Sequence, residues 1–220
     1  MGKNKLVRFA VIAQRDNVIE VGKDIYKSIK GNWKKYFGNG NPIYLELACG
    51  RGEYTTGLAA VYADINFVGV DVKGARIWKG SSVAVENNLT NAAFLRIKMY
   101  LLAEFFDENE VDGIWLTFPD PRPKDQDDRH RLTYIRYMKM YKSILSKDGF
   151  FYFKTDNPGL FDYTLEVLKD PELAVRDLVY TNDLYNSELM SEHHGIITTY
   201  ERLFVKKGYS INYMKFRFGE

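Results

Sequence analysis

The 220-residue sequence has one cysteine, three histidines and no long apolar run, and each scarcity excludes a class of protein. With Cys49 alone, the chain can form neither an internal disulfide nor a cysteine-rich zinc site. His193 and His194 are adjacent, so their side chains diverge, and since no further ligand cluster accompanies them we expect no bound metal. No stretch approaches the roughly 20 apolar residues of a membrane span, so we expect no membrane partner.

The N-terminal residues give no sign of export. Met1 to Arg8 is basic, but it leads into no apolar segment followed by a small-residue cleavage site. The sequence therefore predicts a protein without a signal peptide. A reducing, cytoplasmic location follows as the default, and it also suits the lone cysteine.

The charges nearly balance, with 31 Lys and Arg against 29 Asp and Glu, so net charge says little about a nucleic-acid partner. Their distribution is more informative. Between positions 122 and 147 there are three acidic residues (125, 127 and 128) and eight basic ones (122, 124, 129, 131, 136, 139, 142 and 147). Such a run most often covers a solvated helix face, and less often binds phosphates in a salt-sensitive way.

Apolar runs alternate with helical patterns after the break at Gly38 to Pro42. This break separates a basic N-terminal extension, residues 1–41, from a single domain, residues 42–220. The patterns predict strands at 43–48, 67–71, 93–97, 113–118 and 150–155, and helices at 53–62, 74–87 and 132–145. This alternation is typical of an α/β fold, a mostly parallel Rossmann-like sheet with helices on both faces. Ligands bind such sheets beyond the carboxyl ends of the strands.

The first of these strand ends has the features of a cofactor loop. Gly50 and Gly52 allow a tight turn and a close approach of the backbone to a ligand. The NAD fingerprint needs a third glycine where this chain has Thr55, which argues against a pyrophosphate cofactor. Glu46 could face a cationic group, and Asp71, at the end of the next strand, could accept hydrogen bonds from ribose hydroxyls. The alternative is an ordinary pair of turn glycines.

The fourth and fifth strand ends carry further acids. Prolines at 119, 121 and 123 stiffen the loop around Asp120, which is either a positioned functional acid or a local cap. Asp156 could bind substrate, or could be the N-cap of the next helix with Asn157 or Pro158 in its first turn. Thr198 and Glu201 have the spacing of a capping box, so their local pattern is structural.

Taken together, these motifs resemble the bacterial, single-chain tRNA (guanine-N7)-methyltransferase family. The resemblance covers nearly the whole chain from Pro42 to Phe218, and five separate motifs fall in the family's order and spacing. They are Leu45-Glu46-x-x-x-Gly50-x-Gly52, Gly69-Val70-Asp71, Phe118-Pro119-Asp120-Pro121-x-Pro123-Lys124 with Arg129-His130-Arg131-Leu132, Thr155-Asp156, and Thr199-x-Glu201.

The resemblance implies a class I methyltransferase with a seven-stranded sheet, S-adenosylmethionine as cofactor and no metal. It further implies that a guanine in the variable loop of tRNA is methylated at N7, by a monomer or a homodimer. The implied cofactor residues are Glu46, Gly50, Gly52, Asp71 and Asp120, with Asp120 also catalytic. The implied guanosine site comprises Lys124, Asp156, Thr198, Thr199, Tyr200 and Glu201.

Three departures from the family pattern leave alternatives open. Arg122 stands where the family usually has Trp, acids dilute the basic cluster after Lys124, and no acid follows the third strand near Met99, where the family holds the adenine amino group. A methyltransferase of the same fold acting on a small molecule or a protein would share the Glu46 and Asp71 half. An RNA-binding relative that has lost catalysis would also fit these departures.

Overall fold

The structure is a computed structural model that describes residues 3–219; Met1 and Gly2 of the predicted basic start, and Glu220, lie outside the described residues. Eight strands form one sheet in the order β1-β4-β3-β2-β5-β6-β8-β7. The six from β1 to β6 are parallel, and β8 is antiparallel to both of its neighbours. The strands are β1 Val18–Ile19, β2 Ile43–Leu47, β3 Asn66–Asp71, β4 Ala92–Arg96, β5 Val111–Thr117, β6 Leu145–Thr155, β7 Val175–Thr181 and β8 Asn212–Phe218.

The mostly parallel Rossmann-like sheet predicted from the sequence is confirmed, with one strand more than expected. The addition is β1, whose two residues pair with Phe94 and Leu95 of β4. A two-residue strand is too short to produce a period-two pattern, which explains why the sequence does not reveal it.

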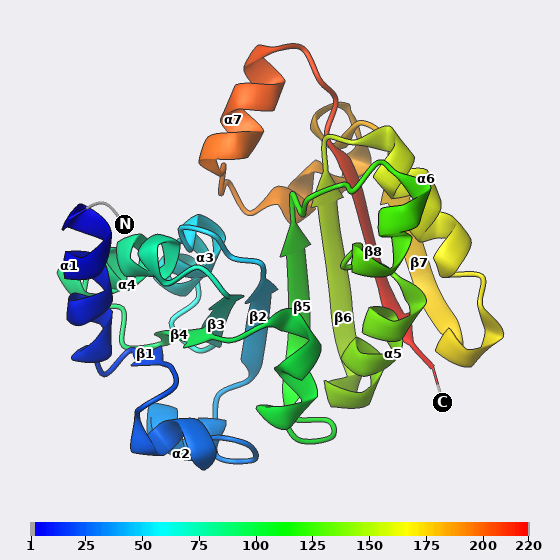
Figure 1. Ribbon diagram of the computed structural model, residues 1–220. Helices are drawn as coiled ribbons and strands as arrows, with labels where there is room; N and C mark the ends of the chain where they lie inside the picture. The colour runs from blue at the N-terminus through cyan, green and yellow to red at the C-terminus, as the bar shows by residue number, and fades with distance from the viewer. Residues whose placement is uncertain (1–2, 220) are drawn as a thin grey trace.

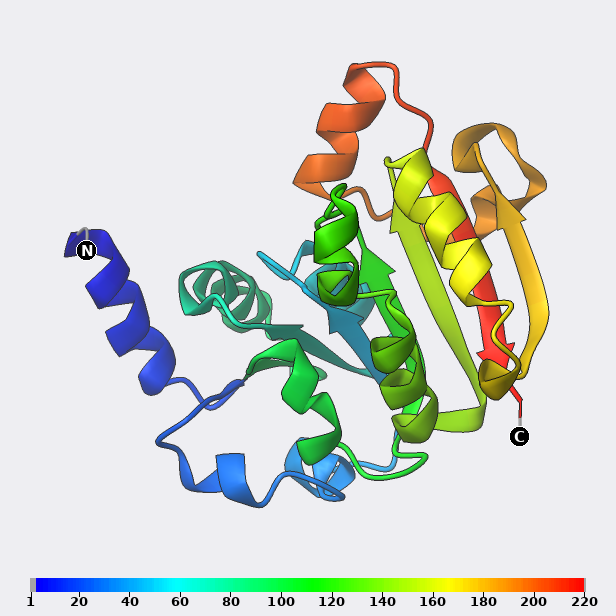
Figure 2. The same cartoon turned by 45° about the vertical axis from the view of Figure 1, so that its right-hand side comes forward.

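Helices cover both faces of the sheet (Figures 1 and 2). One face packs against α2, α5 and α6, and the other against α1, α3 and α4. Both faces of the central strands are therefore buried, as their continuous apolar runs require. The helices are α1 Lys3–Ala13, α2 Trp33–Phe37, α3 Glu53–Val61, α4 Gly74–Glu86, α5 Ile135–Ile144, α6 Pro158–Val167 and α7 Thr199–Lys206.

The segment before Pro42 packs onto the same core. Trp33 of α2 is fully buried, and its ring stacks on Phe106 at a centroid distance of 5.0 Å. Its indole N–H donates to the carbonyl of Phe105 at 2.8 Å. Earlier in the same segment, Arg8 of α1 lies over the ring of Trp78 on α4. Burial of an aromatic ring this large ties the N-terminal segment to the domain energetically.

One helix start differs from the predicted one, and an alternative left open for a second is decided. Helix α5 begins at Ile135 rather than at 132, because residues 125–130 form a 3-10 helix and the chain turns again at Arg131 and Tyr134. Helix α6 is capped by Asn157 and not by Asp156: the Asn157 side chain accepts from the Leu160 N–H at 2.8 Å, with Pro158 in the first turn.

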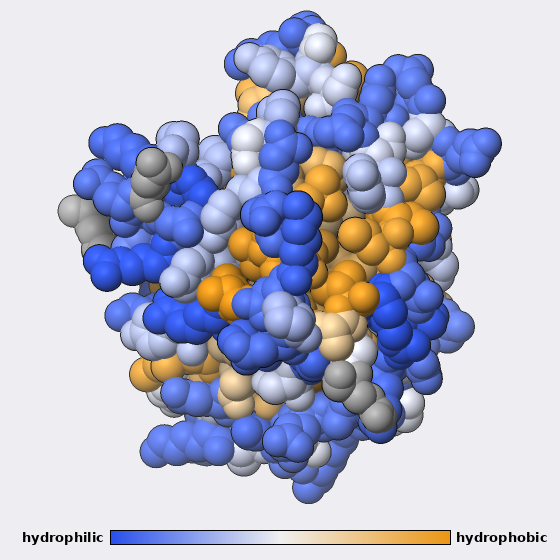
Figure 3. All heavy atoms as spheres, turned by 90° about the vertical axis from the view of Figure 1, so that its right-hand side faces the viewer, coloured by the Kyte–Doolittle hydropathy of each residue, from blue (hydrophilic) through white to orange (hydrophobic). Residues whose placement is uncertain are grey.

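None of the described helices is long and apolar enough to cross a membrane. Apolar side chains do gather on the face seen in Figure 3, among hydrophilic ones. Strand β7 forms this edge of the sheet and exposes Leu178 and Val179 by more than a third.

Candidate functional site

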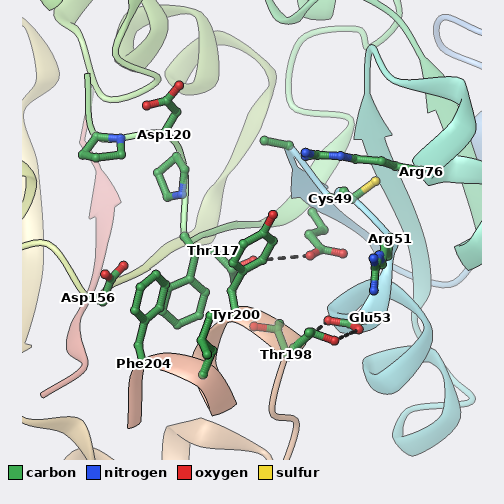
Figure 4. A pocket seen from close by; sticks show the side chains of 18 of the residues that line it. Cys49, Arg51, Glu53, Arg76, Thr117, Asp120, Asp156, Thr198, Tyr200 and Phe204 are labelled. Atoms are coloured by element: carbon green, nitrogen blue, oxygen red, sulfur yellow. Dashed lines mark hydrogen bonds between the residues drawn. The ribbon is translucent and has the colours of Figure 1, made fainter. Parts of the chain in front are cut away.

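A cavity of about 610 Å³ opens at the carboxyl ends of β2, β5 and β6 (Figure 4). It lies where the strand order reverses between β2 and β5, the position at which open α/β sheets bind ligands. Seven predicted site residues line it: Glu46, Gly50, Asp120, Asp156, Thr198, Thr199 and Tyr200. Four others do not: Gly52, Asp71, Lys124 and Glu201.

Glu46 forms the floor of the cavity and is almost completely buried. One carboxylate oxygen accepts from the backbone N–H of Thr55 at 2.7 Å and from its hydroxyl, and the other accepts from the Thr117 hydroxyl at 3.3 Å. Burial raises the pKa of Glu46 to about 7, although these hydrogen bonds oppose the rise. The arrangement favours a cation in the cavity, because a positive charge would restore the ionised form.

Asp71 lies just behind the cavity and fixes the loop that borders it. Its two carboxylate oxygens accept from the N–H of Gly50 at 2.9 Å and of Lys73 at 2.7 Å. Each oxygen keeps a second lone pair, as a residue that binds neighbouring hydroxyls needs.

Gly52 has a different task from Gly50. Its φ is +67°, and a Cβ there would lie 2.5 Å from the ring of Phe94. The glycine is therefore required for the close packing of the turn against β4.

Asp120 lies at the exposed rim, with about two thirds of its side chain accessible. Its carboxylate pairs with the Arg122 guanidinium at 3.2 Å and accepts from the Arg122 N–H at 3.3 Å. Figure 4 shows the carboxylate pointing away from the labelled residues of α7. Arg122, where the sequence departs from the family pattern, thus acts as the local counter-ion of Asp120.

Asp156 and Lys124 differ in whether they reach the cavity. Asp156 is half-buried in the cavity wall, and burial raises the pKa of its carboxyl. Lys124 is exposed and outside the cavity, at the start of the 3-10 helix over residues 125–130. Asp156 can therefore contact a small group inside the cavity, whereas Lys124 can only reach a larger partner.

Helix α7 supplies the wall opposite Asp120. Thr198 is its N-cap and accepts from the Glu201 N–H at 3.1 Å, so the predicted capping contact forms. Thr199 donates its N–H, at 2.6 Å, and its hydroxyl to Glu53, which directly follows the cofactor loop. Tyr200 reaches from the helix into the cavity (Figure 4).

Glu201 is fully buried behind this wall rather than exposed to the cavity. It forms an ion pair with Lys154 of β6 at 2.6 Å, and neither side chain is accessible. Burial lowers the pKa of Lys154. Burial raises the pKa of Glu201, but the hydrogen bond from His193 and the charge of Lys154 bring it below its usual value. In this structure Glu201 therefore anchors α7.

Several cavity residues escape sequence reasoning. Arg51, Lys73 and Arg76 bring positive charge to the wall, from the turn before α3 and the start of α4. Phe118 of the loop after β5 stacks on Phe204 of α7, with ring centroids 6.4 Å apart. The sequence could have indicated Lys73 and Arg76, because two cations three positions apart at the start of a helix share one face. It could not have indicated the contact between Phe118 and Phe204, because these residues are far apart in the chain.

The end of β4 and the residues after it carry cations where the family usually has an acid. Arg96 pairs with the buried Glu20 at 2.8 Å, and the Lys98 ammonium lies 5.7 Å from the ring of Tyr100. In residues 3–219 no group of three or more His, Cys, Asp or Glu side chains could hold a metal. Cys49 lines the cavity, but burial raises the pKa of its thiol, which disfavours the nucleophilic thiolate.

Comparison with known proteins gives consistent results. Residues 40–214 match a protein-family model described as "Putative methyltransferase". The chain is 50% identical to the tRNA (guanine-N(7)-)-methyltransferase of Cytophaga hutchinsonii, over 99% of both chains. It is 42% identical to the enzyme of the same name from Bacteroides fragilis, over 98% of this chain and 86% of that one.

Solved structures similar to this one share the fold at low sequence identity. An antibiotic-related methyltransferase superposes with a TM-score of 0.63 at 14% identity, covering 93% of this chain and 98% of its own. The 16S rRNA methyltransferase KamB gives 0.64 at 10% identity, covering 86% and 94%. These likenesses support the class I methyltransferase fold.

Proposed function

Because the chain belongs to the tRNA (guanine-N(7)-)-methyltransferase family, we propose that it transfers the methyl group of S-adenosylmethionine to N7 of a guanine in tRNA. We further propose that the guanine lies in the variable loop. The observation that carries the proposal is that one cavity is lined by the cofactor loop, through Glu46 and Gly50, and by the acids Asp120 and Asp156. A cofactor and a substrate base can meet there.

The residues in and beside the cavity fit S-adenosylmethionine. S-adenosylmethionine supplies a methyl group bound to a positively charged sulfur. Glu46 would hold a cationic part of it, since the buried carboxylate gains from a positive neighbour. Asp71, oriented by the Gly50 and Lys73 amides, would accept from the ribose hydroxyls. The cations after β4 do not match the family's acidic adenine contact, so we expect the backbone there to recognise adenine.

The chain's residues have to align the substrate and exclude water. N7 of guanine already has an in-plane lone pair, so no base has to create the nucleophile. Alignment of this lone pair with the methyl–sulfur bond can contribute about 7–11 kcal/mol to the lowering of the barrier. The bound cofactor would supply the methyl group and keep the sulfur's electron pair, and the methylated guanine ring would then carry the positive charge. Asp120 and Asp156 would accept from the N1–H and N2–H edge and stabilise this charge.

The first test is to identify the product. Purified protein, labelled S-adenosylmethionine and unmodified tRNA should give 7-methylguanosine, identified by mass spectrometry after nuclease digestion. Asp120→Asn keeps the shape of the side chain but removes its charge, so we expect kcat to fall on the order of 100-fold. Unchanged turnover of this variant at saturating substrates would contradict the role given to Asp120.

Two alternatives predict other outcomes of the same experiment. A methyltransferase that acts on a small molecule or a protein would bind the cofactor yet leave tRNA unlabelled. An RNA-binding relative without catalysis would bind tRNA and release no labelled nucleoside.

Location and assembly are the remaining parts of the proposal. We propose a cytoplasmic enzyme that needs no metal, so chelation should leave its turnover unchanged. The protein is expected to be a monomer or a homodimer, and light scattering of the purified protein distinguishes the two.

A further inference from the structure

Helix α7 projects from the sheet as a separate arm, while it also supplies one wall of the cavity (Figure 1). Glycines with positive φ flank it: Gly195 at +71° and Gly208 at +82°, and neither has other atoms within 4 Å of the position of a Cβ. Tyr200 and Leu203 of the helix are each about half exposed. Phe204 is the α7 residue that packs against the apolar core, so the position of the helix depends on polar contacts as well.

The strongest of these contacts is a buried polar cluster behind the wall. Glu201 is the one α7 residue among those described that is fully buried, and its Oε1 lies 2.6 Å from the Lys154 ammonium. The same oxygen is 3.1 Å from His193 Nε2 and 3.3 Å from the Tyr185 hydroxyl. Tyr185 and His193 also contact each other at 3.1 Å, so the four side chains form one connected network.

Lys154 joins this network to the loop that carries Asp120. Its backbone carbonyl accepts from the Phe118 N–H at 2.8 Å, and its ammonium lies 5.9 Å from the centre of the Phe118 ring. Phe118 in turn stacks on Phe204 of α7. Phe118 has a φ of +49°, a conformation that a non-glycine residue keeps only when its surroundings hold it. Lys154 thus contacts both α7, through Glu201, and the loop that carries Asp120, through Phe118.

Burying these four polar side chains costs desolvation free energy that apolar side chains would not cost. Glu201 Oε2 and His193 Nδ1 are buried without a hydrogen-bond partner among the described residues. Apolar side chains of similar size often pack as well or better than a buried ion pair. A buried pair instead fixes geometry, because displacing either partner leaves the other charge without compensation.

We propose that Lys154 is a positioning residue, which holds α7 through Glu201 so that Tyr200 and Phe204 face the Asp120 loop across the guanosine site. The inference rests on the proposed function for the identity of the substrate. The anchoring of α7 itself does not depend on that identity. Lys154 acts from behind the wall and touches no reacting atom.

The test compares wild type with Lys154→Met and with the neutral pair Lys154→Met/Glu201→Gln. The double variant keeps side-chain shape and avoids leaving a lone buried charge, so it tests the proposal even where the single variant does not fold. Lys169→Met is the matched control, because Lys169 pairs with Glu166 at the same 2.6 Å on an exposed helix end. Hydrogen exchange of the α7 amides and steady-state kinetics with tRNA are measured on all four proteins.

We expect the α7 amides of the double variant to exchange about tenfold faster or more, while amides of β2 and β5 exchange as in wild type. The kcat/KM for tRNA should fall about 10- to 100-fold, mainly through KM, with the dissociation constant of S-adenosylmethionine within about threefold. Unchanged α7 exchange, or faster exchange throughout the core, would overturn the proposal. Failure of wild type to methylate tRNA would count against the proposed function alone, since the exchange measurement stands without it.

Discussion

At the scale of single residues, Glu46 combines two roles that pull its protonation in opposite directions. It accepts from the Thr55 amide in the first turn of α3, where a carboxylate stabilises the helix end. It is also buried at the cavity floor, and desolvation raises its pKa to about 7. Without a cation nearby, much of Glu46 is therefore protonated at neutral pH.

This pKa predicts a pH-dependent cofactor affinity. A cationic ligand needs the ionised carboxylate, so below about pH 7 binding must first remove a proton from Glu46. We expect S-adenosylmethionine affinity to rise with pH up to about tenfold per unit below pH 7 and to level off above it. Isothermal titration calorimetry in buffers of different ionisation enthalpy measures both the affinity and the released proton.

Glu46→Gln provides the control for this prediction. The variant should bind the cofactor weakly, with little dependence on pH between 6 and 8 as an approximate working range. Wild-type affinity that stays constant over that range would show that the burial of Glu46 does not control binding.

At the scale of elements, two neighbouring residues after β6 have different roles, one in stability and one at the cavity. Its side chain caps α6, while the preceding Asp156 faces the cavity. Asn157→Ala should lower the free energy of unfolding by about 1 kcal/mol through loss of the cap, as measured by urea denaturation. Asn157→Asp should be nearly neutral, since Asp caps as well as Asn; an equal loss in both variants would point to a role other than capping.

The strands and the acids at their ends were the predictable part of this molecule. Hydrophobic patterning predicts β2, β3, β4 and β5 because these strands are almost wholly buried, and it predicts the buried carboxyl-terminal part of β6; the acids follow from where these runs stop. The pairs Glu53 with Thr199 and Lys154 with Glu201 join residues 146 and 47 positions apart. No local pattern encodes such contacts, so the capping spacing of Thr198 and Glu201 is visible while the buried partner of Glu201 is not.

At the scale of the whole molecule, Trp33 tests whether the N-terminal segment is part of the cooperative fold. Its ring is buried against Phe106, so Trp33→Ala should lower the free energy of unfolding by about 3–5 kcal/mol. Leu6→Ala, at an exposed position of the same segment, should change it by less than about 0.5 kcal/mol. Chemical denaturation followed by circular dichroism measures both, and a small effect of Trp33→Ala would mean that the segment folds separately.

The salt dependence of binding should differ between tRNA and S-adenosylmethionine. Several cations of the 122–147 run are already paired, Arg122 with Asp120, Arg131 with Asp128 and Lys139 with Glu172, so fewer remain for phosphates than the sequence suggests. With roughly three phosphate contacts, tRNA affinity should fall about 20- to 40-fold between 50 and 200 mM salt. Cofactor affinity should change much less; filter binding and calorimetry across this range compare them, and equal salt dependence would contradict a phosphate-binding surface.

The two edge strands of the sheet limit how two copies of the protein can associate. One edge ends in β1, only two residues long, and the pairing of the other, β7, is irregular between Arg176 and Val179, where Asp177 has a φ of +54°. Short or irregular edge strands with charged residues resist the addition of a further strand from another chain. Contacts between copies across the β7 edge would then be made by side chains such as Leu178 rather than by a continuous intermolecular sheet, and they should stay reversible at high protein concentration.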